Sequence, residues 1–191
     1  MATAAADSTT EARLAALEAR VAALEPLRDE RDISRLMHRY IEACDHVRVA
    51  SYTASMFTVD AVWEGANRYV EFGITEGRDA IEAMFVDTPE LLPFTAHWLT
   101  NAVIDVSDDR QSAVGKWEVI QTATFGRSNT PVWVGARYDN EFRKVDGAWL
   151  IHHIRYADVF VTPFDQGWNT TPYVSPFTED GSVPPSSDAA S

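Results

Sequence analysis

Four long runs of alternating apolar and polar residues constrain this chain more than any other feature of its sequence. The runs are rich in Val, Ile, Thr and Trp, and a period of two residues indicates strands that bury one face. Turn-forming segments separate them (Ser-Asp-Asp-Arg-Gln, Gly-Arg-Ser-Asn-Thr-Pro and Val-Asp-Gly), so each strand is expected to pair with the next in an antiparallel meander. The predicted strands span residues 96–106, 112–125, 132–144 and 148–161.

Helical patterns precede these strands. Residues 29–45 repeat apolar side chains at helical spacing, and shorter helices are expected over 49–57 and 77–85, with a strand beginning at 60–65 between them. Helices followed by an antiparallel meander predict an α+β fold, in which the helices cover one face of a curved antiparallel sheet. Such an arrangement leaves a concave pocket between the two layers.

The N-terminal segment predicts a further helix over residues 11–25. Its apolar residues follow a heptad pattern, and Pro26 is expected to end it. About two heptads are too few for a stable isolated coiled coil. The helix therefore either self-associates or packs on its own domain. The heptad positions are Leu14, Leu17, Val21 and Leu24.

Charge and proline usage divide the chain into an N-terminal helical extension (1–28), an α+β domain (29–162) and a Pro-rich acidic tail (163–191). The tail holds five of the nine prolines and no Lys or Arg. From about Thr178 it is expected to be disordered. Its first half carries four aromatic residues that could form a strap over the body or the pocket mouth: Phe164, Trp168, Tyr173 and Phe177.

Composition excludes several classes of function. With 16 basic and 29 acidic residues the chain has a formal net charge of −13, which argues against binding to nucleic acid or to an anionic membrane surface. Nothing in the sequence indicates a bilayer span or a secretory signal, so a cytoplasmic protein is expected. Cys44 is the only cysteine, and no two histidines have the i, i+4 spacing of a helical metal site. Neither a metal nor a cofactor is expected.

Two residues stand out as candidate chemical groups. Asp45 ends an otherwise apolar helix stripe, where a partly buried carboxylate needs a partner; alternatively, it caps the following segment. His97 lies early in the first long strand, where it could be a base or a structural histidine. Glu118 and His152 lie on later strands, where solvated or subunit-facing positions are the simpler interpretation.

The order of several segments resembles the SnoaL-like branch of the nuclear transport factor 2-like superfamily. These segments are the helix with Tyr40 and Asp45, Met-Phe-Thr-Val-Asp-Ala-Val-Trp-Glu-Gly, Gly-Arg-Asp-Ala-Ile, Thr-Ala-His-Trp-Leu-Thr-Asn, and Tyr-Asp-Asn-Glu-Phe-Arg-Lys-Val-Asp-Gly-Ala-Trp. The resemblance covers roughly residues 29–165. Within the family, the pattern is similar to that of hexachlorocyclohexane dehydrochlorinase, scytalone dehydratase and bile-acid dehydratase.

The resemblance implies a cone-shaped α+β barrel that forms a homo-oligomer, with a trimer favoured over a dimer, and a cofactor-free Asp–His dyad inside. Carried onto this chain, the dyad is Asp45 and His97, and Tyr40 matches a polar position one helical turn earlier. A third catalytic group has no clean match: Glu118 is the nearest acid. The residues expected to bind the substrate are Trp63, Phe85, Trp98, Glu118, Tyr138, His152 and Tyr156.

The implied function is a cofactor-independent lyase of aromatic compound metabolism. It would remove water or formaldehyde from a hydrophobic, aromatic or polycyclic small molecule, with His97 as the general base. Two alternatives remain open from the sequence: an isomerase or cyclase that uses the same dyad, and a non-catalytic ligand-binding or assembly module.

Overall fold

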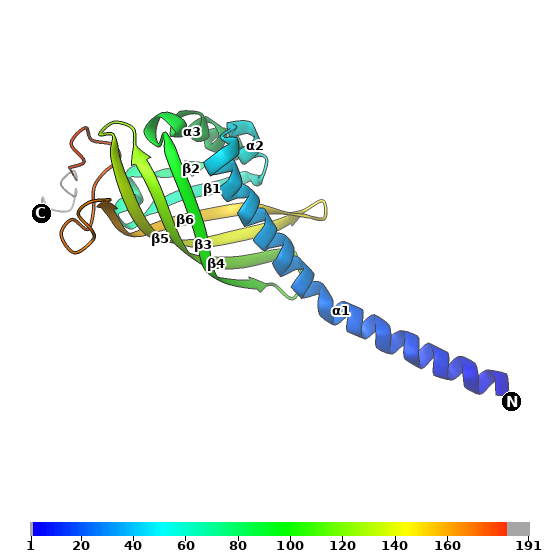
Figure 1. Cartoon of the computed structure of the whole chain (residues 1–191). Helices are drawn as coiled ribbons and strands as arrows, with labels where there is room; N and C mark the ends of the chain where they lie inside the picture. The colour runs from blue at the N-terminus through cyan, green and yellow to red at the C-terminus, as the bar shows by residue number, and fades with distance from the viewer. Residues whose placement is uncertain (1, 183–191) are drawn as a thin grey trace, which may run out of the picture.

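The computed structural model describes residues 2–182, and over these residues three α-helices lie against a six-stranded sheet (Figure 1). The helical elements are α1 (Ala2–Glu42), a π-helical turn (Ala43–Val47), α2 (Ala50–Ala54), a 3₁₀ helix (Asn67–Phe72) and α3 (Arg78–Leu91). The strands are β1 (Phe57–Ala66), β2 (Ile74–Glu76), β3 (Phe94–Val106), β4 (Ser112–Phe125), β5 (Thr130–Val145) and β6 (Ala148–Pro163).

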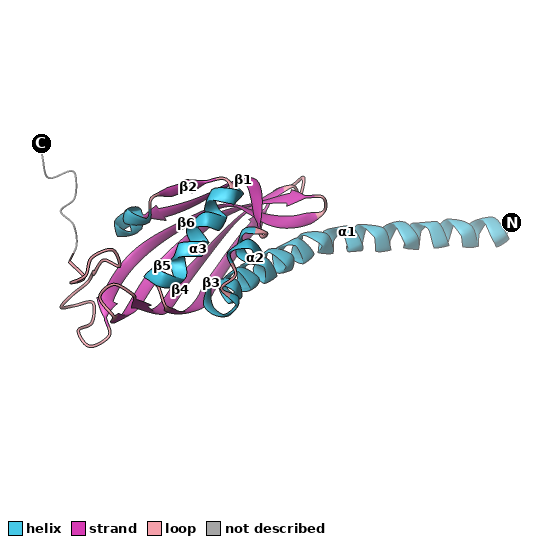
Figure 2. Cartoon of the chain, turned by 90° about the horizontal axis from the view of Figure 1, so that it is seen from above, coloured by secondary structure: helices cyan, strands magenta, loops and turns pink. Residues whose placement is uncertain are grey.

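The sheet has the strand order β2-β1-β6-β5-β4-β3. The four long strands β3–β6 form the predicted antiparallel meander, and the α+β class is confirmed. The sheet is mixed rather than purely antiparallel, because β1 pairs in parallel with β6. Parallel neighbours need a long crossover connection, and the whole meander supplies it here. The sheet curves around α3 without closing, so β2 and β3 remain its edges (Figure 2).

Helix α1 shows that the expected helix end at Pro26 is wrong, because the helix continues through this residue to Glu42. Proline removes one backbone hydrogen bond and crowds the carbonyl four residues earlier, at a cost of about 3 kcal/mol. Pro26 is flanked by strong helix formers, and the turns that follow it are anchored in the core, which offsets that cost. The extension and the first domain helix are therefore one continuous rod (Figure 1).

The hydrophobic core lies between α1 and the inner face of the sheet. Ile33 and Met37 are fully buried on the helix, and Ile151 and Ile154 are fully buried on β6. The aromatic pair Trp117 and Phe142, with ring centroids 6.0 Å apart, closes this end of the core from β4 and β5.

A buried carboxylate fastens α1 to the turn between β3 and β4 and to the ends of β5 and β6. Asp29 is 4% exposed and accepts hydrogen bonds from three donors. The donors are Arg110 Nε at 2.6 Å, Lys144 Nζ at 2.6 Å and Trp149 Nε1 at 2.9 Å. Buried carboxylates are tolerated only when their oxygens are satisfied in this way. The cluster thus decides where α1 meets the sheet.

The C-terminal segment fits the strap prediction in part. Tyr173 is buried and bridges to Val161 on β6, and the ring of Phe177 lies 4.9 Å from that of Phe72. Phe164 and Trp168 are instead exposed, because they lie in the turns that lead away from β6. Most of the stretch expected to be disordered, residues 183–191, lies outside the described residues.

Within residues 2–182, no helix combines the length and the apolar character that a membrane crossing requires.

Candidate active site

Asp45 lies in the π-helical turn that ends the long rod of α1. π-Helical turns are rare and are often found at functional sites. Arg48 ends this turn in the left-handed region, with φ of 53°, and its N–H donates to the carbonyl of Ala43 over 2.8 Å. The turn directs the Asp45 side chain toward the start of β3, where it is only 5% exposed.

His97 on β3 meets this carboxylate through two hydrogen bonds. The backbone N–H of His97 donates to Asp45 Oδ2 over 2.8 Å, and the ring nitrogen Nδ1 lies 2.6 Å from Asp45 Oδ1. An ionised carboxylate only accepts hydrogen bonds, so Nδ1 carries the proton. The neutral imidazole is therefore held as the tautomer whose Nε2 has a free lone pair.

The carboxylate of Asp45 remains ionised despite its burial. Desolvation by burial tends to raise its pKa, but the hydrogen bonds and the charge interaction with His97 outweigh this effect and hold the pKa below the ordinary 3.8. The pair therefore combines a permanent negative charge with a base of fixed orientation.

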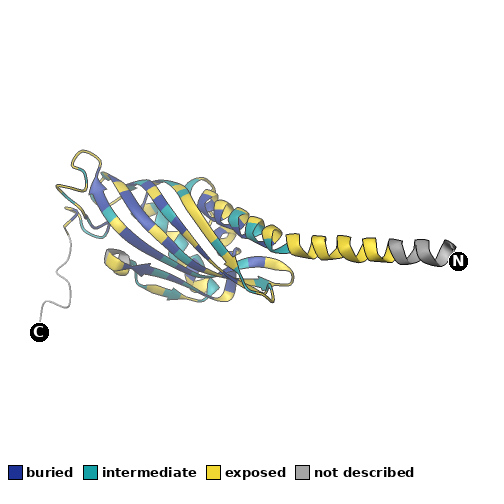
Figure 3. Ribbon diagram, turned by 90° about the horizontal axis from the view of Figure 1, so that it is seen from below, coloured by how far each residue is buried: buried dark blue, intermediate teal, exposed yellow. Residues whose placement is uncertain are grey.

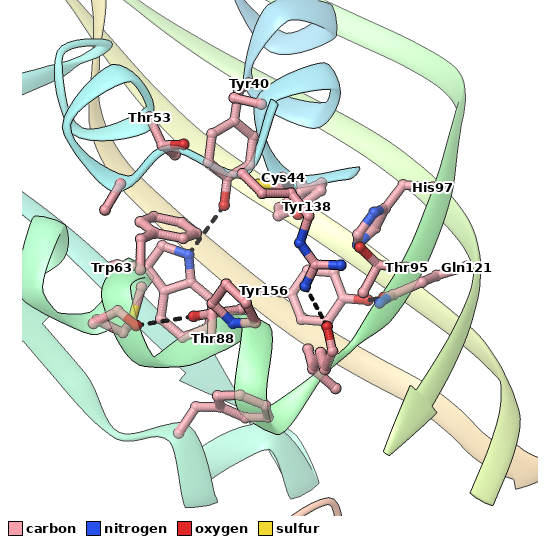
Figure 4. A pocket seen from close by; sticks show the side chains of 18 residues that line it. Tyr40, Cys44, Thr53, Trp63, Thr88, Thr95, His97, Gln121, Tyr138 and Tyr156 are labelled. Carbon is pink, nitrogen blue, oxygen red and sulfur yellow. Dashed lines mark hydrogen bonds between the residues drawn. The ribbon is translucent and has the colours of Figure 1, made fainter. Parts of the chain in front are cut away.

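The His97 ring forms part of the wall of a pocket between the helices and the inner face of the sheet (Figure 4). The pocket has a cavity volume of about 90 Å³. Most of its wall is apolar. The aromatic lining residues are Tyr40, Trp63, Phe72, Phe85, Tyr138 and Tyr156.

Two phenols meet at the inner end of this pocket. The rings of Tyr40 and Tyr138 lie edge to face with centroids 6.4 Å apart, and Trp63 Nε1 donates to the Tyr40 hydroxyl over 3.3 Å. Burial raises the pKa of both tyrosines well above 10.0, and burial raises the pKa of the neighbouring Cys44 thiol to about 12. The phenols therefore keep their protons at neutral pH and can donate to an oxygen of a bound molecule.

Of the ten residues expected at the site, seven gather at this pocket. Tyr40, His97, Trp63, Phe85, Tyr138 and Tyr156 line it, and Asp45 stands behind His97.

The other three expected residues lie elsewhere. Trp98 follows His97 on β3 and is 51% exposed, because successive strand side chains point to opposite faces. For the same reason Glu118 points outward, where Arg137 Nε donates to it over 2.9 Å. His152 lies at a bulge between β5 and β6, which turns it toward β1; there its Nδ1 lies 3.0 Å from Thr58 Oγ1.

The structure adds polar lining residues that sequence reasoning missed. Gln121 on β4 accepts a hydrogen bond from the Tyr156 hydroxyl over 2.7 Å, and Thr95 is buried beside His97. Gln121 could have been found from the sequence, since it is a polar residue in the inward-facing alternation of β4. Arg48, which also lines the pocket, could not have been found in this way, because its position depends on the π-helical turn.

Arg48 links that turn to the corner that leads into β3. Its guanidinium donates to the carbonyl of Pro93 over 2.7 Å and to that of Leu92. These contacts hold the start of β3, and with it His97, against the segment that carries Asp45.

Replacing Arg48 by alanine is expected to lower the free energy of unfolding by about 2 kcal/mol, since hydrogen bonds from a charged donor contribute about 1.5–3 kcal/mol. Urea denaturation would measure this loss. Arg35→Ala is the matched control, because Arg35 is exposed and its nearest carboxylate, that of Asp32, is 3.9 Å away. Equal losses in the two variants would contradict the linking role of Arg48.

Among residues 2–182, no three His, Cys, Asp or Glu side chains are grouped closely enough to hold a metal ion.

Comparison with solved structures shows the same architecture in other proteins. A scytalone dehydratase-like protein from Novosphingobium aromaticivorans is 20% identical over 77% of this chain and 94% of its own, with a TM-score of 0.64. The hexachlorocyclohexane dehydrochlorinase LinA-type3 from Novosphingobium barchaimii is 19% identical over 75% and 94%, with a TM-score of 0.66. A variant of a Mycobacterium tuberculosis protein of unknown function is 20% identical over 70% and 73%, with a TM-score of 0.59. At these identities the likeness shows the fold.

No curated protein matches the chain in a search of sequences. A family model for the SnoaL-like domain matches residues 25–155. This range spans more than half of the chain and takes in α1 from Glu25, the residues Asp45 and His97, and the sheet as far as β6. The chain therefore belongs to the SnoaL-like domain family.

Proposed function

We propose that this protein is a cofactor-independent lyase that eliminates water, or another small group, from a hydrophobic small molecule. The observation that carries the proposal is the pair of hydrogen bonds from His97 to Asp45, at 2.6 and 2.8 Å, on the wall of a largely apolar pocket. A histidine held in one tautomer with its other nitrogen free is suited to act as a general base.

In the proposed reaction, Nε2 of His97 removes a proton from a substrate carbon adjacent to the carbon that bears the leaving group. The electron pair of the broken C–H bond forms the new double bond, and the C–O bond to the leaving group breaks. Asp45 is a positioning residue: its carboxylate holds Nδ1–H and stabilises the imidazolium that forms. The proton taken up by His97 can then reach the departing oxygen.

Tyr40 and Tyr138 would assist the departing or charge-accumulating oxygen. Both phenols remain protonated because burial raises their pKa values. A buried O–H donor stabilises developing negative charge more strongly than water does, since the site does not have to reorganise during the reaction.

The substrate class follows from the wall of the pocket. Six aromatic side chains line the pocket together with His97, and aromatic rings pack favourably on other aromatic rings, offset-stacked or edge to face. Two solved structures of the same fold carry the names of enzymes that eliminate a small group, a dehydratase-like protein and a dehydrochlorinase. An aromatic or polycyclic alcohol is thus the substrate that we propose.

A screen of aromatic alcohols and diols with mass detection tests this proposal. We expect a product lighter than the substrate by one water, formed by the wild-type protein and not by His97→Gln. Loss of one formaldehyde would show a retro-aldol lyase and would leave the role of His97 as the general base unchanged. An isomeric product of unchanged mass would replace the lyase by an isomerase. Turnover at an undiminished rate in His97→Gln would overturn the proposal.

A further inference from the structure

The N-terminal half of α1 extends far beyond the sheet (Figure 1), and from Thr10 to Leu24 its residues are exposed to solvent (Figure 3). Leu14 and Leu17 are each 55% exposed, and Val21 and Leu24 are each 59% exposed. Packing of this segment on its own domain, one of the two alternatives from the sequence, is therefore excluded for these side chains. Four large apolar side chains in one stripe are the pattern of a helix that pairs with another helix.

The stripe also points away from the body of the protein. At 100° per residue, the direction of the four apolar residues differs by about 140° from that of the buried positions on the same helix. Those buried positions are Asp29, Ile33, Leu36, Met37, Tyr40 and Ile41. A second helix can therefore lie along the stripe without meeting the sheet of the same chain.

The charged residues on either side of the stripe indicate which kind of helix can pair with it. With Leu14 and Val21 at heptad position a and Leu17 and Leu24 at d, Glu18 is at e and Arg13 is at g. Glu11 and Arg20 repeat these e and g positions one heptad earlier and one heptad later, respectively. One flank of the stripe is therefore acidic and the other is basic.

Within a single helix, Arg13, Glu18 and Arg20 form no stabilising charge pair. Charged side chains on a helix interact three or four positions apart, and the residues at those distances from Arg13, Glu18 and Arg20 are all uncharged. Among the ion pairs of the described residues, none involves these three side chains. A second helix alongside the stripe would supply each of them with a charged partner.

We propose that residues 11–25 pair with the same segment of a second copy of this chain as a parallel, in-register, two-stranded coiled coil. In this arrangement position g of one helix faces position e of the next heptad on the other helix. Arg13 then faces Glu18 of the second copy, and Arg20 faces its Glu25. An antiparallel pairing would oppose Arg to Arg and Glu to Glu.

The stripe itself supports two strands. Of the two a positions one is the β-branched Val21 and both d positions are leucine, and β-branched residues at a with leucine at d favour dimers over higher assemblies. The helix is also continuous with the buried part of α1, so it is already formed before pairing, and a preformed helix loses less conformational entropy on association. The seam ends at the body, where Glu25 contacts Arg110 of its own chain over 2.9 Å.

Cysteine cross-linking of the full-length chain tests the proposal. In a parallel pair that is in register, the introduced thiols of Leu14→Cys lie opposite each other, within the Cα separation that a disulfide requires. Ala19→Cys is the matched control, because position f points away from the seam. The native Cys44 should react little, since burial raises its pKa to about 12 and keeps the thiol protonated. We expect rapid disulfide-linked dimers of Leu14→Cys under mild oxidation and little product from Ala19→Cys.

Charge exchange then tests the orientation, with the dissociation constant measured by sedimentation. Arg13→Glu and Glu18→Arg each place like charges across both symmetric contacts. Each is expected to weaken pairing by about tenfold, a change of about 1.4 kcal/mol. The double variant restores opposite charges and should recover the wild-type value. Because neither residue has a charged neighbour three or four positions away on its own helix, a change in helix stability would not produce this recovery.

Three results would overturn the proposal. The first is equal cross-linking of Leu14→Cys and Ala19→Cys. The second is a double variant that is no tighter than the single variants, which would exclude the parallel register. The third is a sedimentation mass of three chains that falls to one chain in Leu17→Glu/Leu24→Glu, which would show that the seam holds three strands.

Discussion

Replacing His97 by glutamine is expected to lower kcat by about three orders of magnitude, since a positioned general base contributes about 10²–10⁴-fold. Glutamine retains polarity and approximate size but does not accept a proton at neutral pH. The substrate identified in the mass-detected screen is the one to use. KM should change little, because the apolar wall of the pocket is intact.

Asp45→Asn provides a sharper test of how the pair works. The backbone N–H of His97 can only donate, so it retains the amide oxygen of the asparagine, and the NH₂ group then faces Nδ1. Nδ1 must now accept, which moves the ring proton to Nε2 and removes the lone pair that faces the substrate. We expect a loss of kcat of about 10²-fold or more from this change of tautomer.

Nitrogen chemical shifts of labelled protein would separate this effect from misfolding. The wild-type His97 ring should show the Nδ1–H form, and Asp45→Asn should show the Nε2–H form at unchanged overall fold. His38→Gln, on the exposed face of α1, is the control for a general histidine effect. Retention of full kcat in His97→Gln would refute the proposed base, and retention of full kcat in Asp45→Asn would refute the positioning role of the carboxylate.

The second large effect is expected at Asp29, away from the pocket. Asp29→Ala should lower the free energy of unfolding by about 3 kcal/mol, because it leaves the largely buried Lys144 ammonium without its carboxylate. Arg110, by contrast, keeps its contact with Glu25. Urea denaturation followed by tryptophan fluorescence would measure the loss. Asp32→Asn on the same helix is the control, since its side chain is 44% exposed, and it should change stability by less than about 0.5 kcal/mol.

The pH dependence of stability gives an independent measure of the Asp29 cluster. Burial tends to raise the pKa of Asp29, but the hydrogen bonds from Arg110, Lys144 and Trp149 outweigh it and lower the pKa from 3.8 to about 2. A carboxyl whose pKa is lower in the folded state contributes stability above its unfolded pKa and loses it as pH falls through the folded value. The difference in free energy of unfolding between the wild type and Asp29→Asn should therefore decrease as the pH falls from about 4 to about 2. A difference that stays constant over this range would contradict the proposed cluster.

The sequence predicted the layers of this protein because they follow from local periodicity. The alternation over residues 96–161 specified four strands, and the period of two by itself assigns Trp98 and Glu118 to the faces opposite His97 and Gln121. The helical stripe from Ile33 to Cys44 similarly placed Tyr40 and Asp45 at one end of a buried helix. The same local argument failed at Pro26, where contacts further along the helix outweigh the proline penalty.

By itself, then, the sequence determined which segments are helix or strand, which face of each is buried, and that residues 11–25 carry a heptad stripe with opposite charges on its flanks. Only the tertiary structure decided which distant residues meet. Asp45 and His97 are 52 positions apart, and Asp29 lies 81, 115 and 120 positions from its three donors. It also decided the parallel pairing of β1 with β6 and the bulge that turns His152 out of the pocket. The physical reason is that periodicity is a local pattern: it shows which face of a helix or strand is buried. A hydrogen bond between distant residues depends instead on how the whole chain folds around its core.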